Sequence, residues 1–206
     1  MELIPLAKSK KTDEKEKEEL SSEDSFKMDL FFWLQALVAA LITLILLFTF
    51  VGRIIGVDGD SMYPTLHNGD LLLLQSVGYE PRQGDVVVLT KEFDASDGPI
   101  VKRVIAVGGQ TVDIDYDEGV VYVDGEALDE SYVMEPTYLD EGTQLPLTVP
   151  EGELFIMGDN RNYSRDSRSV DVGCVKEDEV VGRCLLRFYP LSRFGKISDT
   201  GRVVFE

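Results

Sequence analysis

The stretch Ile100-Val101-Lys102-Arg103-Val104-Ile105-Ala106-Val107 is the clearest β-strand in the sequence. Its β-branched and apolar side chains favour extended backbone, and the glycine pair that follows it is a turn signal. Side chains two residues apart in a strand share a face, so Lys102 is predicted to lie on an apolar face and Arg103 on the opposite one. The predicted neighbours of Lys102 on that face are Ile100, Val104 and Ala106.

A lysine on an apolar strand face has two explanations. Lys102 could belong to an edge strand, where a charged side chain discourages pairing with another molecule. Alternatively, its amine is buried, in which case desolvation lowers the pKa and allows the neutral amine to take a proton from a hydroxyl group.

Other short apolar runs repeat this pattern through the rest of the chain. Turns containing Gly-Asp, Asp-Gly or proline separate them, and no second helix shows a 3.6-residue pattern. Residues 52–206 therefore predict a mostly β domain of antiparallel sheets. The other predicted strands are Asp70–Leu74, Asp85–Leu89, Val120–Val123, Glu153–Met157 and Glu179–Phe188.

The N-terminal part of the chain differs in composition. Residues 1–29 are rich in lysine and acidic residues, which predicts a disordered or weakly helical tail. Residues 30–51 carry no charge and would span about 33 Å as a helix, enough to cross a hydrocarbon core of about 30 Å. This run is too long and starts too late for a cleaved secretory signal, and it lacks the polar stripe of a buried core helix. We therefore expect one transmembrane helix at 30–51.

Flanking charges predict the orientation of this helix. Lys15, Lys17 and Lys27 precede the span, whereas Arg53 alone follows it closely. Because positively charged flanks stay on the cytoplasmic side, the N-terminus is predicted to be cytoplasmic and residues 52–206 extracytoplasmic. The protein is thus expected at the cell membrane as a single-pass protein in contact with lipid.

Composition excludes several functions. The 206 residues include 38 acidic and 20 basic ones, for a net charge of −18, which argues against nucleic-acid binding. One histidine and two cysteines cannot build a four-ligand zinc site, so no metal or other cofactor is expected. His67, the only imidazole, would have to serve any Ser-His-Asp triad.

Two polar segments could carry chemistry. Residues 59–70 contain Ser61 shortly before Pro64, which restricts the backbone around the hydroxyl. Residues 158–168 combine Asp159, Asp166 and three arginines, and Asp166 could pair with Arg168 or with Arg103. Taken alone, each segment could equally be an ordinary surface loop.

Their combination is more specific. Ser61-Met62-x-Pro64-Thr65-Leu66, then Gly69-Asp70, Lys102-Arg103, and Gly158-Asp159-Asn160-Arg161 through Ser164-x-Asp166-Ser167-Arg168 follow in this order behind a membrane span. This arrangement resembles bacterial type I signal peptidases over residues 31–195. The resemblance implies a β domain like that of signal peptidases and LexA-type proteins.

The resemblance also implies roles for individual residues. Ser61 would be the nucleophile and Lys102 the general base of a Ser/Lys dyad that works through an acyl-enzyme. Ser164 would orient the Lys102 amine, while Asp166 and Arg168 would form a supporting ion pair with Arg103 nearby. The substrates would be secretory preproteins, cut after an Ala-x-Ala site.

The oxyanion donors and the substrate pockets are assigned from the positions of residues in the sequence. The Ser61 N–H is one expected oxyanion donor. Some family members place a serine hydroxyl two residues before the nucleophile, where this chain has Gly59. Small apolar pockets would explain the Ala-x-Ala preference, and the side chains expected to line them are Val57, Met62, Leu66 and Val101.

Other readings stay open. A catalytically inert signal-peptidase-like protein could act as an assembly factor for pilins or other exported proteins, although such a protein would be expected to lack the lysine. A self-cleaving LexA-type protease should carry a DNA-binding domain in place of the span. Cys174 and Cys184 could form a disulfide outside the cytoplasm or remain two buried thiols. Residues 113–119 predict a β-hairpin turn rather than a calcium loop.

Overall fold

The computed structural model describes residues 7–50, 52–90 and 99–197. The chain divides into two compact units, Met1–Phe48 and Thr49–Glu206, and each is described by itself. The first unit contains the N-terminal helix, and the second contains the β-strands.

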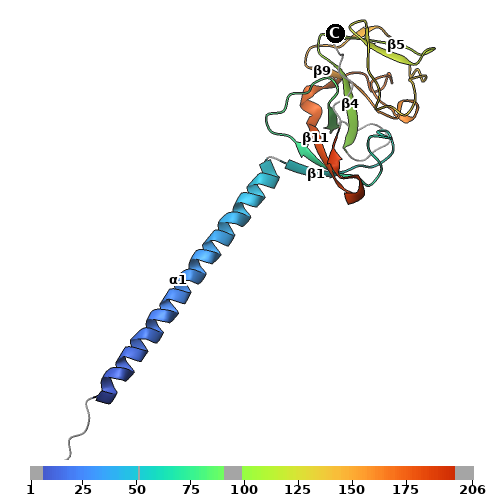
Figure 1. Cartoon of the computed structure of the whole chain (residues 1–206). Coiled ribbons are helices and arrows are strands. Elements are labelled where there is room, and N and C mark those ends of the chain that lie inside the picture. Colours follow the sequence, from blue (N-terminus) through green and yellow to red (C-terminus); the bar gives the residue numbers. More distant parts are fainter. Residues whose placement is uncertain (1–6, 51, 91–98, 198–206) are drawn as a thin grey trace, which may run out of the picture. The chain divides into compact units, whose positions relative to one another are not determined.

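Helix α1 (Ala7–Phe50) is continuous over 44 residues (Figure 1). Its window Asp24–Ile45 has a mean hydropathy of 2.0 and no buried residue, so length and composition suffice to cross a membrane. Residues 7–29, predicted to be disordered or weakly helical, continue this helix. Lysine and glutamate are good helix formers, and opposite charges four residues apart stabilise a helix. Val51, the predicted last residue of the span, lies outside the described residues.

The larger sheet has eight strands, all in antiparallel pairs. Its order is β1-β2-β11-β3-β4-β9-β10, and β12 pairs with β11. The strands are β1 (Gly52–Gly56), β2 (Leu71–Gln75), β3 (Val86–Leu89), β4 (Ile100–Val107), β9 (Glu153–Met157), β10 (Val175–Lys176), β11 (Val180–Tyr189) and β12 (Gly195–Lys196).

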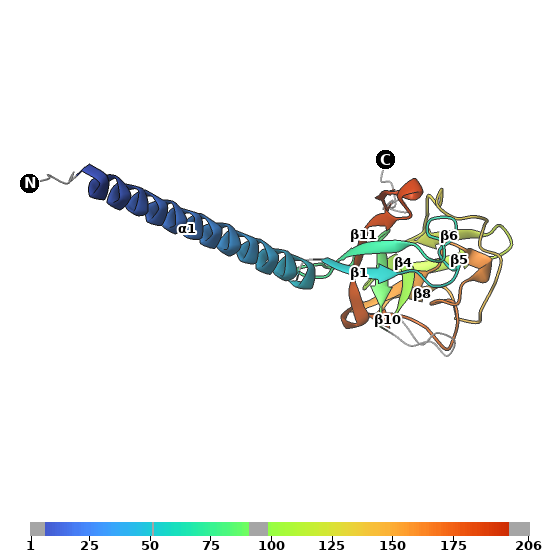
Figure 2. The ribbon, with the colours of Figure 1, turned by 90° about the horizontal axis from the view of Figure 1, so that it is seen from below.

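A smaller sheet of four strands has the order β7-β6-β5-β8. Figures 1 and 2 place β5 on the opposite side of the domain from β1. The strands are β5 (Thr111–Asp115), β6 (Val120–Val123), β7 (Glu126–Ala127) and β8 (Leu147–Thr148). Short 3₁₀ turns complete the domain: η1 (Arg161–Tyr163), η2 (Glu177–Glu179) and η3 (Leu191–Arg193).

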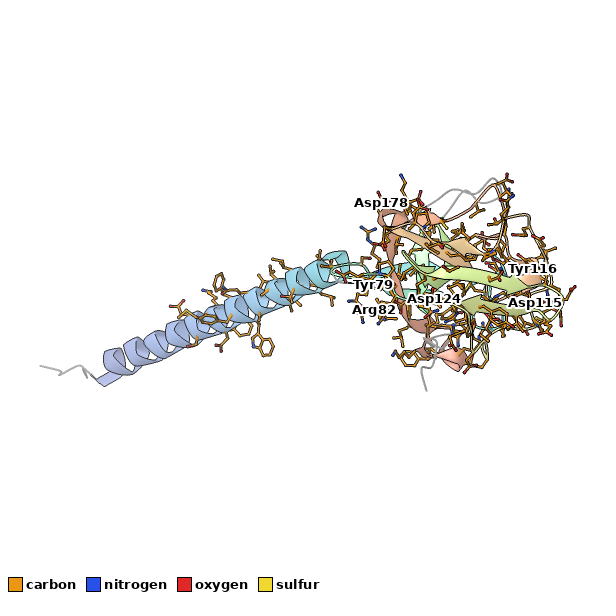
Figure 3. All side chains as sticks on the ribbon, turned by 90° about the horizontal axis from the view of Figure 1, so that it is seen from above. Tyr79, Arg82, Asp115, Tyr116, Asp124 and Asp178 are labelled. Atoms are coloured by element: carbon orange, nitrogen blue, oxygen red, sulfur yellow. The ribbon has the colours of Figure 1, made fainter. Side chains whose placement is uncertain are left out.

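The predicted mostly β fold is confirmed, and each predicted strand is present. The hairpin at residues 113–119 is also present: Asp115 accepts hydrogen bonds from the N–H groups of Asp117 and Glu118. Figure 3 places Asp115 and Tyr116 across the domain from Tyr79 and Arg82. Strand β1 was missed because it directly follows the apolar run. Strand β5 was predicted only as a flank of the hairpin, and the two-residue strands carry too little pattern to detect.

Strand β4 decides between the two explanations for Lys102. It lies between β3 and β9, inside the larger sheet, so the edge-strand explanation is wrong. The predicted alternation holds as far as Val104, which shares an apolar cluster with Ile100. It fails at Ala106, which packs in a different cluster, because the pairing with β9 shifts between Val104 and Ala106 and inserts a residue.

The two cysteines occupy different parts of the core. Cys184 is buried in the cluster under β2 and β3, whereas Cys174 packs against the cluster under the smaller sheet. No disulfide joins them in the structure.

Candidate active site

Ser61 lies in the turn between β1 and β2. Within this turn, the Tyr63 N–H donates to the Asp60 carbonyl at 3.1 Å and the Leu66 N–H donates to the Met62 carbonyl at 2.8 Å. Met62 and Leu66 are almost completely buried in the apolar cluster beneath. The turn is therefore anchored in the core by side chains that follow Ser61 in the sequence.

Lys102 reaches this hydroxyl from β4. Its Nζ donates to Ser61 Oγ at 2.7 Å, and the residue is only 4% exposed. Burial lowers the pKa of the Lys102 amine from 10.5 to about 8, although the nearby Asp166 carboxylate opposes the change. At pH 7 about a tenth of the amine is then neutral, compared with roughly 3 parts in 10,000 for an ordinary lysine.

The next residue on β4 supports the same turn by another route. Arg103 donates from Nε and Nη2 to the two carboxylate oxygens of Asp159 at 2.8 and 2.7 Å, and both side chains are fully buried. Asp159 Oδ2 also accepts from Thr65 Oγ1 at 2.5 Å. Successive residues of β4 thus hold the turn at Ser61 and at Thr65.

Asp166 pairs with Arg168, one of the two partners that the sequence left open. Arg168 donates from Nε and Nη2 to the carboxylate at 2.8 and 2.9 Å. Asp166 Oδ2 also accepts from the Gly158 N–H at 2.9 Å. All of these polar groups are buried, so the pair fixes the start of the segment that faces Ser61.

Ser164 lies at the site, but it does not orient the lysine by a hydrogen bond. Its Oγ is buried and has no hydrogen-bond partner among the described residues. A Cβ added at Gly158 would lie closer than 3.0 Å to the side chain of Ser164 and to the carbonyl oxygen of Ser61. Ser164 and the Ser61 backbone thus meet across Gly158, and no hydrogen bond joins Ser164 Oγ to Lys102.

Asn160 holds the Ser61 backbone directly. Its N–H donates to the Ser61 carbonyl at 3.0 Å, and its side-chain Nδ2 donates to the Asp60 carbonyl at 3.1 Å. The Ser61 N–H itself has no hydrogen-bond partner among the described residues. That donor is available for an oxyanion formed next to Ser61 Oγ.

The predicted pocket residues all belong to one apolar cluster, together with Leu72, Leu74 and Val86. Met62 and Leu66 are at most 1% exposed, and Val57 and Val101 are at most 7% exposed. They flank Ser61 and Lys102 in the sequence. His67 instead packs the edge of its ring against Tyr63, with 5.0 Å between ring centres.

Sequence reasoning did not assign roles to Thr65, Gly158, Asp159 and Asn160. The Gly-Asp-Asn order was a usable signal, because a glycine before two short polar residues allows close backbone contact. The partner of Arg103 could not be read from the sequence, since Asp159 and Asp166 both lie in the same polar segment.

A serine hydroxyl bonded to a buried lysine amine on a β scaffold is the arrangement of a serine hydrolase whose general base is lysine. Known proteins agree with this class. Residues 30–189 match the family model described as signal peptidase, peptidase S26. The chain therefore belongs to the signal peptidase family, peptidase S26.

Individual relatives cover most of the chain. A probable signal peptidase I-1 of Synechocystis is 38% identical over 174 residues, which are 79% of this chain and 84% of that protein. Signal peptidase I S of Bacillus subtilis is 34% identical over 187 residues, 85% of this chain and 98% of that protein. The crystal structure of a signal peptidase I from Enterococcus faecalis matches with a TM-score of 0.41 at 30% identity, covering 51% of this chain and 97% of that one.

Proposed function

We propose that this chain is a membrane-anchored serine endopeptidase that removes signal peptides from exported preproteins, with Ser61 as nucleophile and Lys102 as general base. The observation that carries the assignment is the 2.7 Å hydrogen bond between Lys102 Nζ and Ser61 Oγ, with Lys102 only 4% exposed. Family membership supports the reaction class, and this geometry supports the choice of residues.

The chemistry follows from the lowered pKa. Neutral Lys102 takes the Ser61 proton as Oγ attacks the carbonyl carbon of the scissile bond. The Ser61 N–H donates to the oxygen of the tetrahedral intermediate, which becomes negatively charged. Lys102, now an ammonium, protonates the leaving amine, and the ester left on Ser61 is the acyl-enzyme. Lys102 then takes a proton from a water molecule that attacks this ester. It returns the proton to Ser61 Oγ as the signal peptide leaves with a free carboxyl group.

The specificity that we propose is for small side chains, as in an Ala-x-Ala site. Val57, Met62, Leu66 and Val101 lie near Ser61 or Lys102 in the sequence and pack in one apolar cluster. Walls of tightly packed apolar side chains accept a methyl group and exclude larger ones by steric clash. Precursors with leucine at the residue before the cut should therefore be processed at least about tenfold more slowly, which corresponds to about 1.4 kcal/mol.

The proposed topology places the N-terminus in the cytoplasm and the β domain on the other side of the membrane. Lys15, Lys17 and Lys27 before the apolar window, against Arg53 after it, support this orientation. Protease added outside intact cells with a permeabilised outer layer should digest the β domain and leave the N-terminal residues. Digestion of the N-terminus alone would reverse the orientation.

The test of the proposed function is cleavage of a precursor with an Ala-x-Ala site by the full, detergent-solubilised chain. Wild type should make one cut, after the second small residue, as located by mass spectrometry. Ser61→Ala and Lys102→Ala should lose this activity, while exposed Lys176→Ala should keep it. Folded wild type that cleaves no precursor of this kind would instead favour the inert assembly factor.

A further inference from the structure

Tyr132 lies between two buried guanidinium groups. The residue is 7% exposed, and the guanidinium carbon of Arg103 lies 3.9 Å from its ring centre. The guanidinium carbon of Arg161 lies 5.8 Å from the same centre. The Tyr132 hydroxyl accepts from Arg161 Nη2 at 3.3 Å and donates to Glu130 Oε1 at 3.4 Å. The ring is thus held by its hydroxyl end while its face covers Arg103.

The Tyr132 ring matters because Arg103 joins β4 to Asp159 and to the Gly84 carbonyl. In the guanidinium plane, Nε and Nη2 bind Asp159 and Nη1 donates to the Gly84 carbonyl at 2.9 Å. In-plane hydrogen bonds do not prevent tilting out of the plane or the entry of water over the face of the group. An aromatic ring at 3.9 Å excludes water from that face and attracts the cation.

A tilt of Arg103 would be transmitted to the nucleophile. Asp159 takes its position from Arg103, and it holds Thr65 through a 2.5 Å hydrogen bond. The neighbouring Asn160 N–H holds the Ser61 carbonyl. Movement of Asp159 therefore displaces the Ser61 turn from both sides, while the Lys102 amine stays on β4.

We propose that Tyr132 is a positioning residue for this peptidase: its ring fixes Arg103, and Arg103 fixes the Ser61 turn through Asp159. The inference rests on the proposed function, because its kinetic consequence is read as precursor cleavage. The hydrogen bonds and ring contacts of Tyr132 go to Glu130, Arg161 and Arg103 and not to Ser61 or Lys102, so we expect its effect on the rate of the chemical step rather than on substrate binding.

The first test is kinetic. Tyr132→Leu should lower kcat about 10- to 100-fold with KM changed less than about twofold, because small misplacements of reacting groups cost up to about 100-fold in rate. Tyr132→Phe keeps the ring and should restore kcat to within about threefold of wild type. Tyr122→Leu, in the smaller sheet, is the matched control and should leave kcat unchanged. Equal losses in the Leu and Phe variants, or a loss in KM alone, would overturn the role of the ring.

A double-mutant cycle separates positioning from general destabilisation. If Tyr132 acts through the Asp159–Thr65 hydrogen bond, Tyr132→Leu should lower kcat much less in a Thr65→Val background than in wild type. Fully multiplicative losses would show that the two residues act independently and would overturn the proposed route.

Hydrogen exchange gives a readout that does not depend on cleavage. In Tyr132→Leu, the amides of Tyr63 and Leu66 in the Ser61 turn should exchange at least about tenfold faster, while amides of β5 and β6 should be unchanged. Unchanged exchange in the turn would reject the inference even if the protein cleaves precursors. If Tyr132→Leu shows faster exchange in the turn but the wild-type protein cleaves no precursor, the positioning role stands and the proposed function is rejected.

Discussion

Replacing Lys102 by methionine should stabilise the folded domain at neutral pH while it abolishes cleavage. The Lys102 amine is 4% exposed, and its burial lowers the pKa from 10.5 to about 8. The unfolded chain therefore holds this proton more tightly than the folded domain does. Methionine has nearly the same length and no charge, so it fills the space without the cost of a buried ammonium.

The magnitude follows from proton linkage. With pKa values of 10.5 unfolded and about 8 folded, the penalty at pH 7 is about 3 kcal/mol, at about 1.36 kcal/mol for each unit of pKa. At pH 9 the folded amine is mostly neutral and the penalty falls to about 2 kcal/mol. The lost hydrogen bond to Ser61 Oγ offsets about 1 kcal/mol at either pH. The stability gain of Lys102→Met should therefore shrink by about 1 kcal/mol between pH 7 and pH 9.

The assay is denaturant unfolding of the full chain in detergent at both pH values. Near-ultraviolet circular dichroism of the domain's tyrosines is the suitable signal, because the single tryptophan, Trp33, lies in α1. Lys176→Met is the control: this lysine is exposed, so its replacement should give no pH-dependent difference. A stability difference for Lys102→Met that is the same at pH 7 and pH 9 would refute a lowered pKa of the buried amine.

Other consequences of the site can be measured directly. Below pH 8, kcat/KM should rise about tenfold per pH unit and then level off, because the general base must be neutral and its pKa is about 8; a flat profile from pH 6 to 9 would contradict this. Gly158→Ala should lower kcat more than about 100-fold, since the added Cβ would meet the Ser61 carbonyl. Steady-state kinetics of the folded variant measure this loss, and an unchanged kcat would contradict it. Asp166→Ala should destabilise the domain by about 3–5 kcal/mol because it leaves the buried Arg168 unpaired, whereas Arg165→Ala at an exposed ion pair should cost less than about 1 kcal/mol in the same melts.

The sequence predicted the architecture well where a strand had enough residues to show its period. Residues 100–107 are one example. Lys102, which the strand period placed among apolar neighbours, is the lysine whose Nζ lies 2.7 Å from Ser61 Oγ. The bulge at Ala106 was not predictable, because inserting one residue into the pairing leaves no mark on the apolar pattern.

Polar pairing was predictable only in part. The sequence left Asp166 with either Arg168 or Arg103 as its partner. In the folded domain Arg103 of β4 pairs with Asp159, and Asp166 pairs with Arg168. Likewise, nothing in the sequence places Tyr132 on Arg103, because about thirty residues and three of the four strands of the smaller sheet separate them along the chain. Contacts of this kind depend on tertiary packing rather than on local pattern.

The most direct measurement is to trap the acyl-enzyme. The full chain is mixed with an Ala-x-Ala precursor, quenched in acid after a single turnover, digested and analysed by mass spectrometry. The peptide that contains Ser61 should carry the signal peptide as an ester, and Lys102→Met should form no such adduct. An adduct on a different residue, or a precursor cut at the same site by Ser61→Ala, would contradict the assignment of the dyad.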